Sequence, residues 1–397
     1  MANLKIFTKN IEQEALNQIY TLIEQPSFQD CKVRIMPDVH AGTGCVIGFT
    51  ADLGDKVIPN IVGVDIGCGM LCVQLSEKDI DLQKLDDIIH NYVPNGREVH
   101  DVRKVKFDKL KDLYCYRNLK DIKRIEKSIG TLGGGNHFIE IDEDEEQNKY
   151  LIIHSGSRNL GKQVADYYQN LAIETMQGKD KLLEMQENLI TEYKSQGKRK
   201  EIQSAIKELH KNFNPNPLKI PKELCYLTDK YREQYLHDMK ICQEYAIENR
   251  ATIADIILSL MNLSSEFSFE TIHNYIEYKT NMVRKGAVSA KKDQMLLIPI
   301  NMRDGCILAR GKGNDEWNQS APHGAGRIMS RNKAREVVNF DDYKNSMNGI
   351  YTTSVNKETI DEAPMAYKPM KEIIDNIQDT VEIVKIIKPI YNFKASE

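Results

Sequence analysis

The 397-residue sequence lacks the segments that direct a protein to a membrane or hold it there. It contains no run of about 18 uncharged apolar residues, which a membrane-spanning helix requires. Its opening residues, MANLKIFTKNIEQEA, include no apolar stretch of the kind found in secretory signal peptides. We therefore expect a cytoplasmic protein that does not associate with a membrane.

Cysteine pairs spaced as CxxC are also missing, and the eight cysteines are scattered along the chain. This usage is ordinary for a reducing compartment, and it predicts neither a disulfide framework nor a four-cysteine zinc site. The cysteines stand at positions 31, 45, 68, 72, 115, 225, 242 and 306. We expect at most a few of these thiols to be functional.

The sequence has no excess of positive charge, because 54 Lys and Arg face 58 Asp and Glu, for a net charge of −4. The surface as a whole is therefore not that of a cationic nucleic-acid binder, and any site for a polyanion must be a local basic patch. A hydrophobic content of 41% excludes a disordered chain and is sufficient for a sizeable core.

Internal repeats, low-complexity tracts and an obvious linker are absent, although the length would allow two or three domains. We therefore expect one α+β body over residues 1–397, with mixed β-sheets flanked by helices. Short β-branched runs broken by Gly and Pro predict strands over residues 1–75. Two buried strands are expected over residues 136–154, and strands with loops over residues 270–345.

Apolar periodicity predicts helices near residues 81–93, 119–130, 162–177, 226–250 and 251–262, and a helix or strand at the carboxyl end. Residues 178–213 combine this periodicity with dense alternating charge, which favours a solvated helical hairpin turned at Ser195–Gly197. The segment NPNPLKIP ends it. We interpret residues 178–221 as an insertion that projects from the body; the alternative is a continuous core helix.

Possible metal ligands stand in four short segments, three of which contain glycine. Each residue alone is more often structural, since a buried histidine or cysteine usually only fills a core. Together, a carboxylate, a thiol and several imidazoles at strand ends indicate a metal site. Mixed oxygen, nitrogen and sulfur ligands suit Mn, Zn or Fe without selecting one. The candidates are Asp65, Cys68, His137, His154 and His273.

His323 differs from the other histidines because Gly324, Ala325 and Gly326 follow it, and then Arg327 and Arg331. Small residues with exposed backbone amides beside arginines are typical of a phosphate cradle, and a histidine at its mouth could serve as nucleophile or acid. The alternative is a flexible loop with a surface histidine. The segment is not a Walker loop, because the GK[ST] ending is missing.

Taken together, these motifs resemble those of the RtcB-type RNA ligases, in particular a compact bacterial branch of that family, over essentially the whole chain. The segments that carry the resemblance are MPDVHAGTGCVIG (36–48), IVGVDIGCGM (61–70), GTLGGGNHFIE (130–140), LIIHSGSRNLG (151–161), YLHDMKICQEYAIENR (235–250), IHNY (272–275), HGAGRIMSR (323–331) and DEAPMAYKP (361–369).

The resemblance implies an enzyme that joins an RNA 3′-phosphate or 2′,3′-cyclic phosphate end to a 5′-hydroxyl end. Such an enzyme uses GTP and two Mn²⁺ ions and acts in RNA repair or tRNA processing. A histidine becomes guanylylated, GMP passes to the RNA 3′-phosphate, and the 5′-hydroxyl displaces it. An activating protein is possible, and a monomer is expected.

The resemblance also implies roles for single residues. Cys68 would bridge the metals, with His154 and His273 at one ion and Asp65 and His137 at the other, and His323 would be guanylylated. The residues expected to contact the nucleotide are Asn136 at phosphate, Glu140 and Lys394 at the guanine, and Tyr367, Asn301, Gly324, Ala325 and Gly326. The motifs do not indicate the residues that contact RNA. Apart from the resemblance, we expect RNA to contact Arg34, Arg158, Arg327 and Arg331, together with basic residues of the insertion, where a merely solvated face is the alternative.

The chain departs from the family pattern at two places. The segment from Pro299 to Gly305 reads PINMRDG where the family has Pro-Gly-Ser-Met-Gly, and Ile272 stands where a second histidine often precedes the ligand. Three alternatives to sealing therefore stay open: guanylyl capping of a 3′-phosphate on RNA or DNA, a non-catalytic protein that binds metal and nucleic acid, and a metal phosphoesterase.

Overall fold

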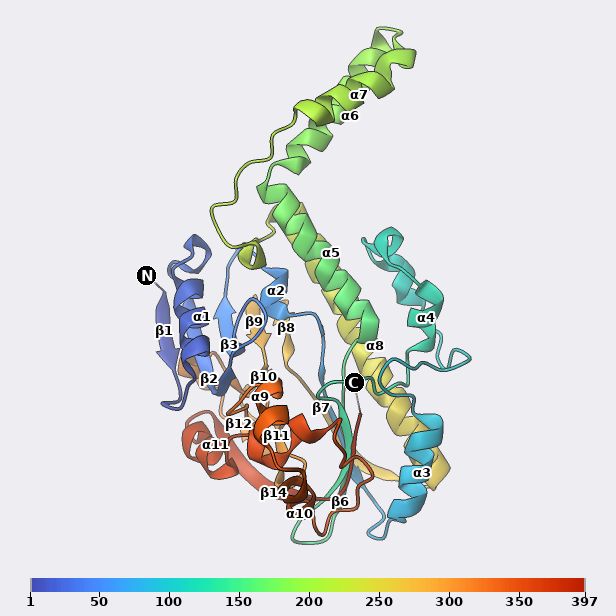
Figure 1. The fold of residues 1–397 in the computed structure, drawn as a ribbon, viewed down its shortest axis with the longest axis vertical. Coiled ribbons are helices and arrows are strands. Elements are labelled where there is room, and N and C mark those ends of the chain that lie inside the picture. Colours follow the sequence, from blue (N-terminus) through green and yellow to red (C-terminus); the bar gives the residue numbers. More distant parts are fainter. Residues whose placement is uncertain (1, 396–397) are drawn as a thin grey trace.

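The computed structural model describes residues 2–395, and it has the α+β class that the sequence predicts (Figure 1). The strands are β1 (Asn3–Ile6), β2 (Lys32–His40), β3 (Ile47–Asp52), β4 (Gly69–Leu75), β5 (Phe138–Glu143), β6 (Lys149–Ser155), β7 (Ser265–Ile272), β8 (Asn274–Glu277), β9 (Met282–Lys285), β10 (Ala287–Ser289), β11 (Met295–Asn301), β12 (Gly305–Gly311), β13 (Ser320–Pro322) and β14 (Val381–Lys394). The helices are α1 (Gln13–Ile23), α2 (Pro59–Val62), α3 (Leu82–Tyr92), α4 (Ile122–Lys127), α5 (Arg158–Met176), α6 (Lys179–Ser195), α7 (Ile202–Asn212), α8 (Asp229–Met261), α9 (Arg331–Val337), α10 (Phe340–Ser346) and α11 (Met370–Ile377).

A five-stranded sheet in the order β1-β2-β3-β9-β8 contains most of the amino-terminal strands that the sequence predicts. Only its β1–β2 pair is parallel. Residues 1–75 also contain helix α1, which the strand prediction for this segment missed. The helix buries Ala15, Ile19 and Leu22, which are four and three residues apart. That spacing places all three on one helical face, where they join the core beside this sheet.

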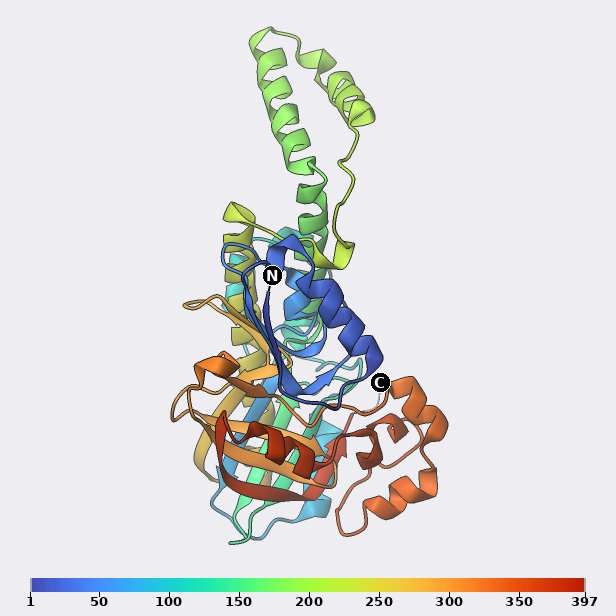
Figure 2. The same ribbon diagram turned by 90° about the vertical axis from the view of Figure 1, so that its left-hand side faces the viewer.

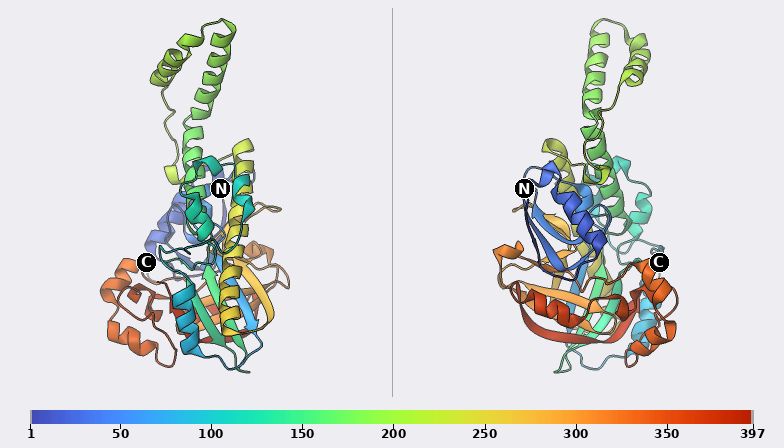
Figure 3. Two further views of the ribbon diagram at one scale, coloured as in Figure 1. Left: turned by 90° about the vertical axis from the view of Figure 1, so that its right-hand side faces the viewer. Right: turned by 60° about the vertical axis from the view of Figure 1, so that its left-hand side comes forward.

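The seven-stranded sheet, in the order β11-β12-β14-β5-β6-β4-β7, is antiparallel throughout and curls until its two edge strands, β7 and β11, contact each other (Figure 3). Its outer face packs on α3 and α8 through residues such as Leu85 and Ile253. Its inner face holds a second apolar cluster that includes Met70, Phe138 and Leu308. The curl leaves one end of the sheet free for polar side chains.

Helix α8 is one continuous helix, so the predicted division into helices over 226–250 and 251–262 is wrong. Neither Pro nor Gly interrupts the segment, and the polar residues at the expected break are buried with partners. Arg250 pairs with Glu270 at 3.0 Å and donates to the backbone oxygen of Ser155 at 2.7 Å. The side chain of Asn249 accepts hydrogen bonds from the backbone of Gly130 and Thr131. Helix α8 therefore supports the loops that carry the candidate ligands.

Helices α6 and α7 form the predicted hairpin, which extends away from both sheets (Figures 1 and 2). Helix α6 ends at Ser195, and Gly197 turns the chain with φ of 74°. Leu182 is the one buried residue of α6, and α7 has none. The hairpin is thus solvated, as the sequence predicts, and the alternative of a continuous core helix is wrong.

Strands with loops were predicted over residues 270–345, and the structure adds two helices, α9 and α10, that begin within this segment. Both helices are short and begin at side-chain caps, Ser330 and Asn339, which the strand patterns around them obscure. The carboxyl end contains α11 followed by β14, which pairs with β12 and β5. Among residues 2–395, the helices are all too short or too polar to cross a bilayer.

Candidate functional site

The candidate metal ligands meet because four strands start or finish at one end of the curled sheet. Cys68 directly precedes β4, His137 precedes β5, His154 lies near the end of β6, and His273 follows β7. In the antiparallel pairing Gly69 faces both Ser155 and Ile272, and Phe138 faces His154. The register alone therefore brings the four ligand side chains together.

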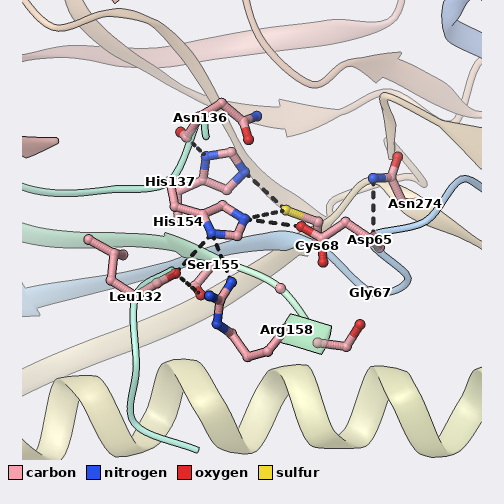
Figure 4. Close-up of polar contacts among 12 residues, drawn as sticks. Asp65, Gly67, Cys68, Leu132, Asn136, His137, His154, Ser155, Arg158 and Asn274 are labelled. Atoms are coloured by element: carbon pink, nitrogen blue, oxygen red, sulfur yellow. Dashed lines mark hydrogen bonds and ion pairs between the residues drawn. The ribbon is translucent and has the colours of Figure 1, made fainter. Parts of the chain in front are cut away.

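The ligand atoms form two groups that share one thiol. Figure 4 shows that thiol, Cys68, beside His137, His154 and Asp65. Cys68 Sγ lies 3.3 Å from His154 Nε2 and 3.5 Å from His137 Nε2. His154 Nε2 is 3.4 Å from His273 Nε2, and His137 Nε2 is 3.0 Å from Asp65 Oδ2. Within each group the ligand atoms lie within 4.8 Å of one another. This donor set fits two metal ions with Cys68 between them.

Backbone carbonyls orient two of the three imidazoles. His137 Nδ1 donates to the oxygen of Leu132 at 2.8 Å, and His154 Nδ1 donates to the oxygen of Asn136 at 3.2 Å. Each ring is thereby oriented with Nε2 toward the cluster, where that nitrogen could bind a metal. His273 Nδ1 is buried and has no hydrogen-bond partner among the described residues.

Burial adjusts the charges of these ligands. It lowers the pKa values of His154 and His273 well below the usual range, and neighbouring cationic side chains lower them further, so both rings are neutral at pH 7. Burial, with help from Asp65, raises the pKa of the Cys68 thiol well above its usual value. Burial also raises the pKa of Asp65, but His137 and Arg158 outweigh it and lower the pKa to about 2. A divalent cation bound here would displace the Cys68 proton.

His323 lies next to this cluster, with its ring centre 4.8 Å from that of His273. Its Nδ1 is 2.6 Å from Asp38 Oδ2, which also accepts the His323 backbone N–H at 3.1 Å. Asp38 is completely buried. Gly326 permits this approach, because its φ is +74° and a Cβ there would lie 2.2 Å from the Asp38 backbone oxygen. The pairing occupies Nδ1 and leaves Nε2 of His323 without a hydrogen-bond partner among residues 2–395.

Beside His323 lies a cavity of about 730 Å³, large enough for a nucleotide. His154 lines it as well, so the cavity reaches the metal-ligand cluster. Every residue that was expected to contact the nucleotide lines this cavity: Asn136, Glu140, Asn301, Gly324, Ala325, Gly326, Tyr367 and Lys394. Arg327 and Arg331 line it too.

Glu362 is the centre of a buried ion network on the wall of the cavity. It pairs with Lys394 and Arg331, each at 2.7 Å, and accepts a hydrogen bond from the Tyr367 hydroxyl at 2.6 Å. Burial raises its pKa, but Lys394, Arg331 and Arg327 together lower the pKa to about 2. The carboxylate is therefore charged at neutral pH and holds the cations in place.

Sequence reasoning missed both Asp38 and Glu362, although each lies in a segment that carries the family resemblance. Asp38 belongs to MPDVH and Glu362 to DEAPMAYKP. Neither segment contains a local pattern that indicates which distant partner the carboxylate meets. Asn392 was missed for the same reason; its side-chain amide donates to Glu140 across the β5–β14 pair.

The four arginines expected to contact RNA lie in different environments. Arg34 is buried and donates to the backbone oxygens of Asn3 and Glu316, so its assignment to RNA is wrong: strand β2 turns it into the protein. Arg158 lies against His137 at 3.3 Å and lines a second cavity of about 870 Å³. Arg327 and Arg331 face the first cavity but already pair with Glu362.

The segment around Asn301, where the sequence departs from the family pattern, forms a tight turn between β11 and β12. Asn301 Oδ1 accepts the backbone N–H groups of Arg303 and Asp304, and its amide donates to the Asp304 carboxylate at 2.8 Å. Arg303 in turn pairs with Asp304 at 2.7 Å. The polar atoms of Asn301 thus serve the turn itself, although the residue borders the cavity.

An oriented histidine between a metal-ligand cluster and a nucleotide-sized cavity is the arrangement of an enzyme active site. Comparison with known proteins identifies the family: the model of the tRNA-splicing ligase RtcB family matches residues 18–118 and 114–395. The chain therefore belongs to the RtcB family.

Relatives align with this chain over nearly its whole length. The RNA-splicing ligase RtcB of Escherichia coli K12 is 30% identical over 437 aligned positions, which cover 99% of this chain and 98% of the relative. The tRNA-splicing ligases RtcB of Archaeoglobus fulgidus and Methanococcus maripaludis are each 25% identical and cover 92% and 97% of this chain, or 87% and 92% of their own lengths.

Proposed function

We propose that this protein is a GTP- and Mn²⁺-dependent RNA ligase that joins 3′-phosphate or 2′,3′-cyclic phosphate ends to 5′-hydroxyl ends. The observation that carries the proposal is the position of His323. Its ring lies between the metal-ligand cluster and the 730 Å³ cavity, and Asp38 holds its Nδ1. Membership of the RtcB family supports the same activity. RNA repair or tRNA processing in the cytoplasm is the proposed setting.

The two groups of ligands would hold the two Mn²⁺ ions. Cys68, His154 and His273 would bind one, and Asp65, Cys68 and His137 the other. When bound, the ions would offset the negative charge that develops on a transferred phosphoryl group. The fit rests on the donor set and on the orientation of the two rings, whose Nε2 atoms face it.

The first step would be attack by His323 Nε2 on the α-phosphorus of GTP. An N–P bond forms, the bond to the β-phosphate breaks, and pyrophosphate leaves. Asp38 accepts the Nδ1 proton in a hydrogen bond, which orients the ring and stabilises the positive charge that develops on it. Backbone amides of Gly324, Ala325 and Gly326 lie at the same wall and would contact phosphate oxygens.

The remaining cavity residues would hold the nucleotide while the RNA reacts. Asn136 would contact phosphate, Glu140 and Lys394 the guanine, and Tyr367 the nucleotide beside the Glu362 network. The RNA 3′-phosphate oxygen would then take GMP from His323, and the 5′-hydroxyl would attack that phosphate as GMP leaves. A 2′,3′-cyclic phosphate would first be opened by water.

For the whole chain we propose a single catalytic domain over residues 1–397, with residues 178–221 as an insertion, that acts as a monomer. The substrate end is proposed to contact Arg158, Arg327 and Arg331, which lie around the metal-ligand cluster and the cavity. An activating protein would act on the guanylylation step.

Incubation with Mn²⁺ and GTP labelled at the α-phosphate tests the proposal. Label on the denatured wild-type protein, and none on His323→Ala, is the expected result. A labelled protein that joins a 3′-phosphate strand to a 5′-hydroxyl strand is a ligase, whereas one that leaves GMP on the unjoined 3′-phosphate is a capping enzyme. Absence of label from protein shown to contain two metal ions would contradict nucleotidyl transfer and favour a non-catalytic protein or a phosphoesterase.

A further inference from the structure

Residues 178–221, here called the arm, carry charge of the opposite sign to the rest of the chain. The arm has nine Lys and Arg against six Asp and Glu, a net charge of +3, so the rest of the chain carries −7. The imbalance is concentrated at the end of the arm. Residues 194–200, here called the tip, read KSQGKRK and contain four cations and no acidic residue.

The four cations of the tip are free to bind a partner. Lys194, Lys198, Arg199 and Lys200 are all exposed, and none forms an ion pair with another of residues 2–395. The base of the arm differs, because Lys179 there pairs with Glu174 at 2.7 Å. Four like charges within seven residues repel one another, and a polyanion would relieve that repulsion.

The tip is connected to the candidate active site by two successive helices. Helix α5 begins at Arg158, which contacts the ligand His137, and α6 continues from its far end into the arm (Figure 1). At 1.5 Å per residue, the 19 residues of α5 and 17 of α6 reach at most about 54 Å. A duplex covers that distance in about 16 base pairs at the B-form rise of about 3.4 Å, and in a few more at the shorter rise of A-form RNA. Either count is more than one helical turn.

We propose that the tip binds the phosphate backbone of a duplex region of the RNA substrate, more than one helical turn from the ends that are joined. The proposal rests on the proposed function, because it assumes that RNA ends react at His323. If the tip binds in this way, the favoured substrates are structured RNAs that have a long helix beside the break. Lysines on mobile stems read charge and not bases, so no sequence preference is expected at the tip.

The test compares two variants that each lose four positive charges. The tip variant is Lys194→Gln, Lys198→Gln, Arg199→Gln and Lys200→Gln. The control variant removes four exposed lysines that lie outside the arm and form no ion pair with residues 2–395: Lys240→Gln, Lys279→Gln, Lys292→Gln and Lys357→Gln. Anisotropy titrations over a range of salt would use RNA stems of about 24 and about 6 base pairs, each with a 3′-phosphate end.

The tip variant is expected to bind the long stem on the order of 10-fold more weakly at low salt, and to flatten the slope of log K against log salt by about 3 to 4. Binding of the short stem should not change, and the control variant should bind both stems like the wild type. Equal losses in both variants, or no loss for the long stem, would overturn the proposal and leave the arm to another class of partner.

Failure of this inference is distinguishable from failure of the proposed function. The tip lies far from His323, so the tip variant should still form the GMP adduct and join short RNA ends at the wild-type rate. Adduct formation together with unchanged long-stem binding would overturn the role of the tip alone. A wild-type protein that forms no adduct yet binds the long stem through the tip would overturn the ligase proposal alone.

Discussion

The metal-ligand cluster and the Glu362 network lie around one cavity but are organised in different ways. In the cluster, strand register brings the side chains together and backbone oxygens of Leu132 and Asn136 orient two imidazoles. In the network, one buried carboxylate holds three cations from distant segments, among them Lys394. The cluster therefore depends on the backbone, whereas the network depends on a single side chain.

The largest expected effect concerns Asp38, which holds the His323 ring beside the metal-ligand cluster. Asp38→Asn should lower the rate of His323 guanylylation by about 10²- to 10⁴-fold, because an amide no longer stabilises the charge on the ring and can favour the wrong tautomer. The measurement is single-turnover labelling with α-labelled GTP. Since the buried Asp38 also accepts the His323 backbone N–H, thermal unfolding must show that the variant is folded.

Two outcomes would give Asp38 a different role. A rate within about threefold of the wild type would show that the His323 ring is oriented by other contacts. An equal loss of nucleotide affinity and rate would show that Asp38 shapes the cavity and does not act through Nδ1.

The shared thiol gives the next largest effect. Cys68→Ala removes a ligand from both groups, so it should weaken binding of both Mn²⁺ ions by more than about 100-fold. His273→Ala removes a ligand from one group only and should leave about one ion of two. Equilibrium dialysis with metal analysis measures both. Retention of one tightly bound ion by Cys68→Ala would contradict a bridging position for the thiol.

Breaking the network should cost stability. Glu362→Gln leaves the buried Lys394 and the largely buried Arg327 without their carboxylate, whereas the partly exposed Arg331 keeps Asp361. We expect a loss of about 3 kcal/mol in the free energy of unfolding. Urea denaturation provides the measurement. Glu358→Gln, at an exposed position nearby, is the matched control and should change stability by less than about 0.5 kcal/mol. Equal effects of the two variants would show that the network is not a structural centre.

The difference between the two regions also explains what the sequence could predict. Cys68 and His154 stand close to glycines at the ends of apolar runs, and strand ends meet when those strands pair, so local pattern was informative for both. Glu362 pairs with cations more than 30 residues away, and Asp38 with a histidine more than 280 residues away. A local sequence pattern cannot indicate a contact between residues so far apart, so the roles of Glu362 and Asp38 were not predicted.

The same reasoning applies to the fold. The hairpin turned at Gly197 was predictable because helical periodicity, dense charge and a breaking segment all lie within 45 residues. The continuity of α8 was not, since it depends on partners such as Glu270 that keep Arg250 buried within the helix. Arg34 shows the opposite error: a cation in a family motif was assigned to RNA, whereas the fold buries it.

The smallest expected effect concerns the charge of Glu140, which lines the cavity. Burial raises the pKa of Glu140 from its usual 4.5 to about 7, although Asn392 and Lys394 act against the rise. The folded protein thus binds a proton that the unfolded chain releases above pH 4.5, so stability should fall as the pH rises from about 5 to 7. Glu140→Gln keeps an oxygen that can accept from Asn392 and removes this titration.

Urea denaturation at pH 5 and at pH 7.5 is the measurement for this prediction. Between these values the wild type should lose about 2 kcal/mol more than Glu140→Gln does, at about 1.36 kcal/mol per pKa unit. The buried Asp142, whose pKa burial and Glu140 also raise, should leave a residual slope in the variant. Parallel profiles for the two proteins would mean that Glu140 is ionised throughout, held by Lys394 as firmly as the Glu362 network holds its own carboxylate.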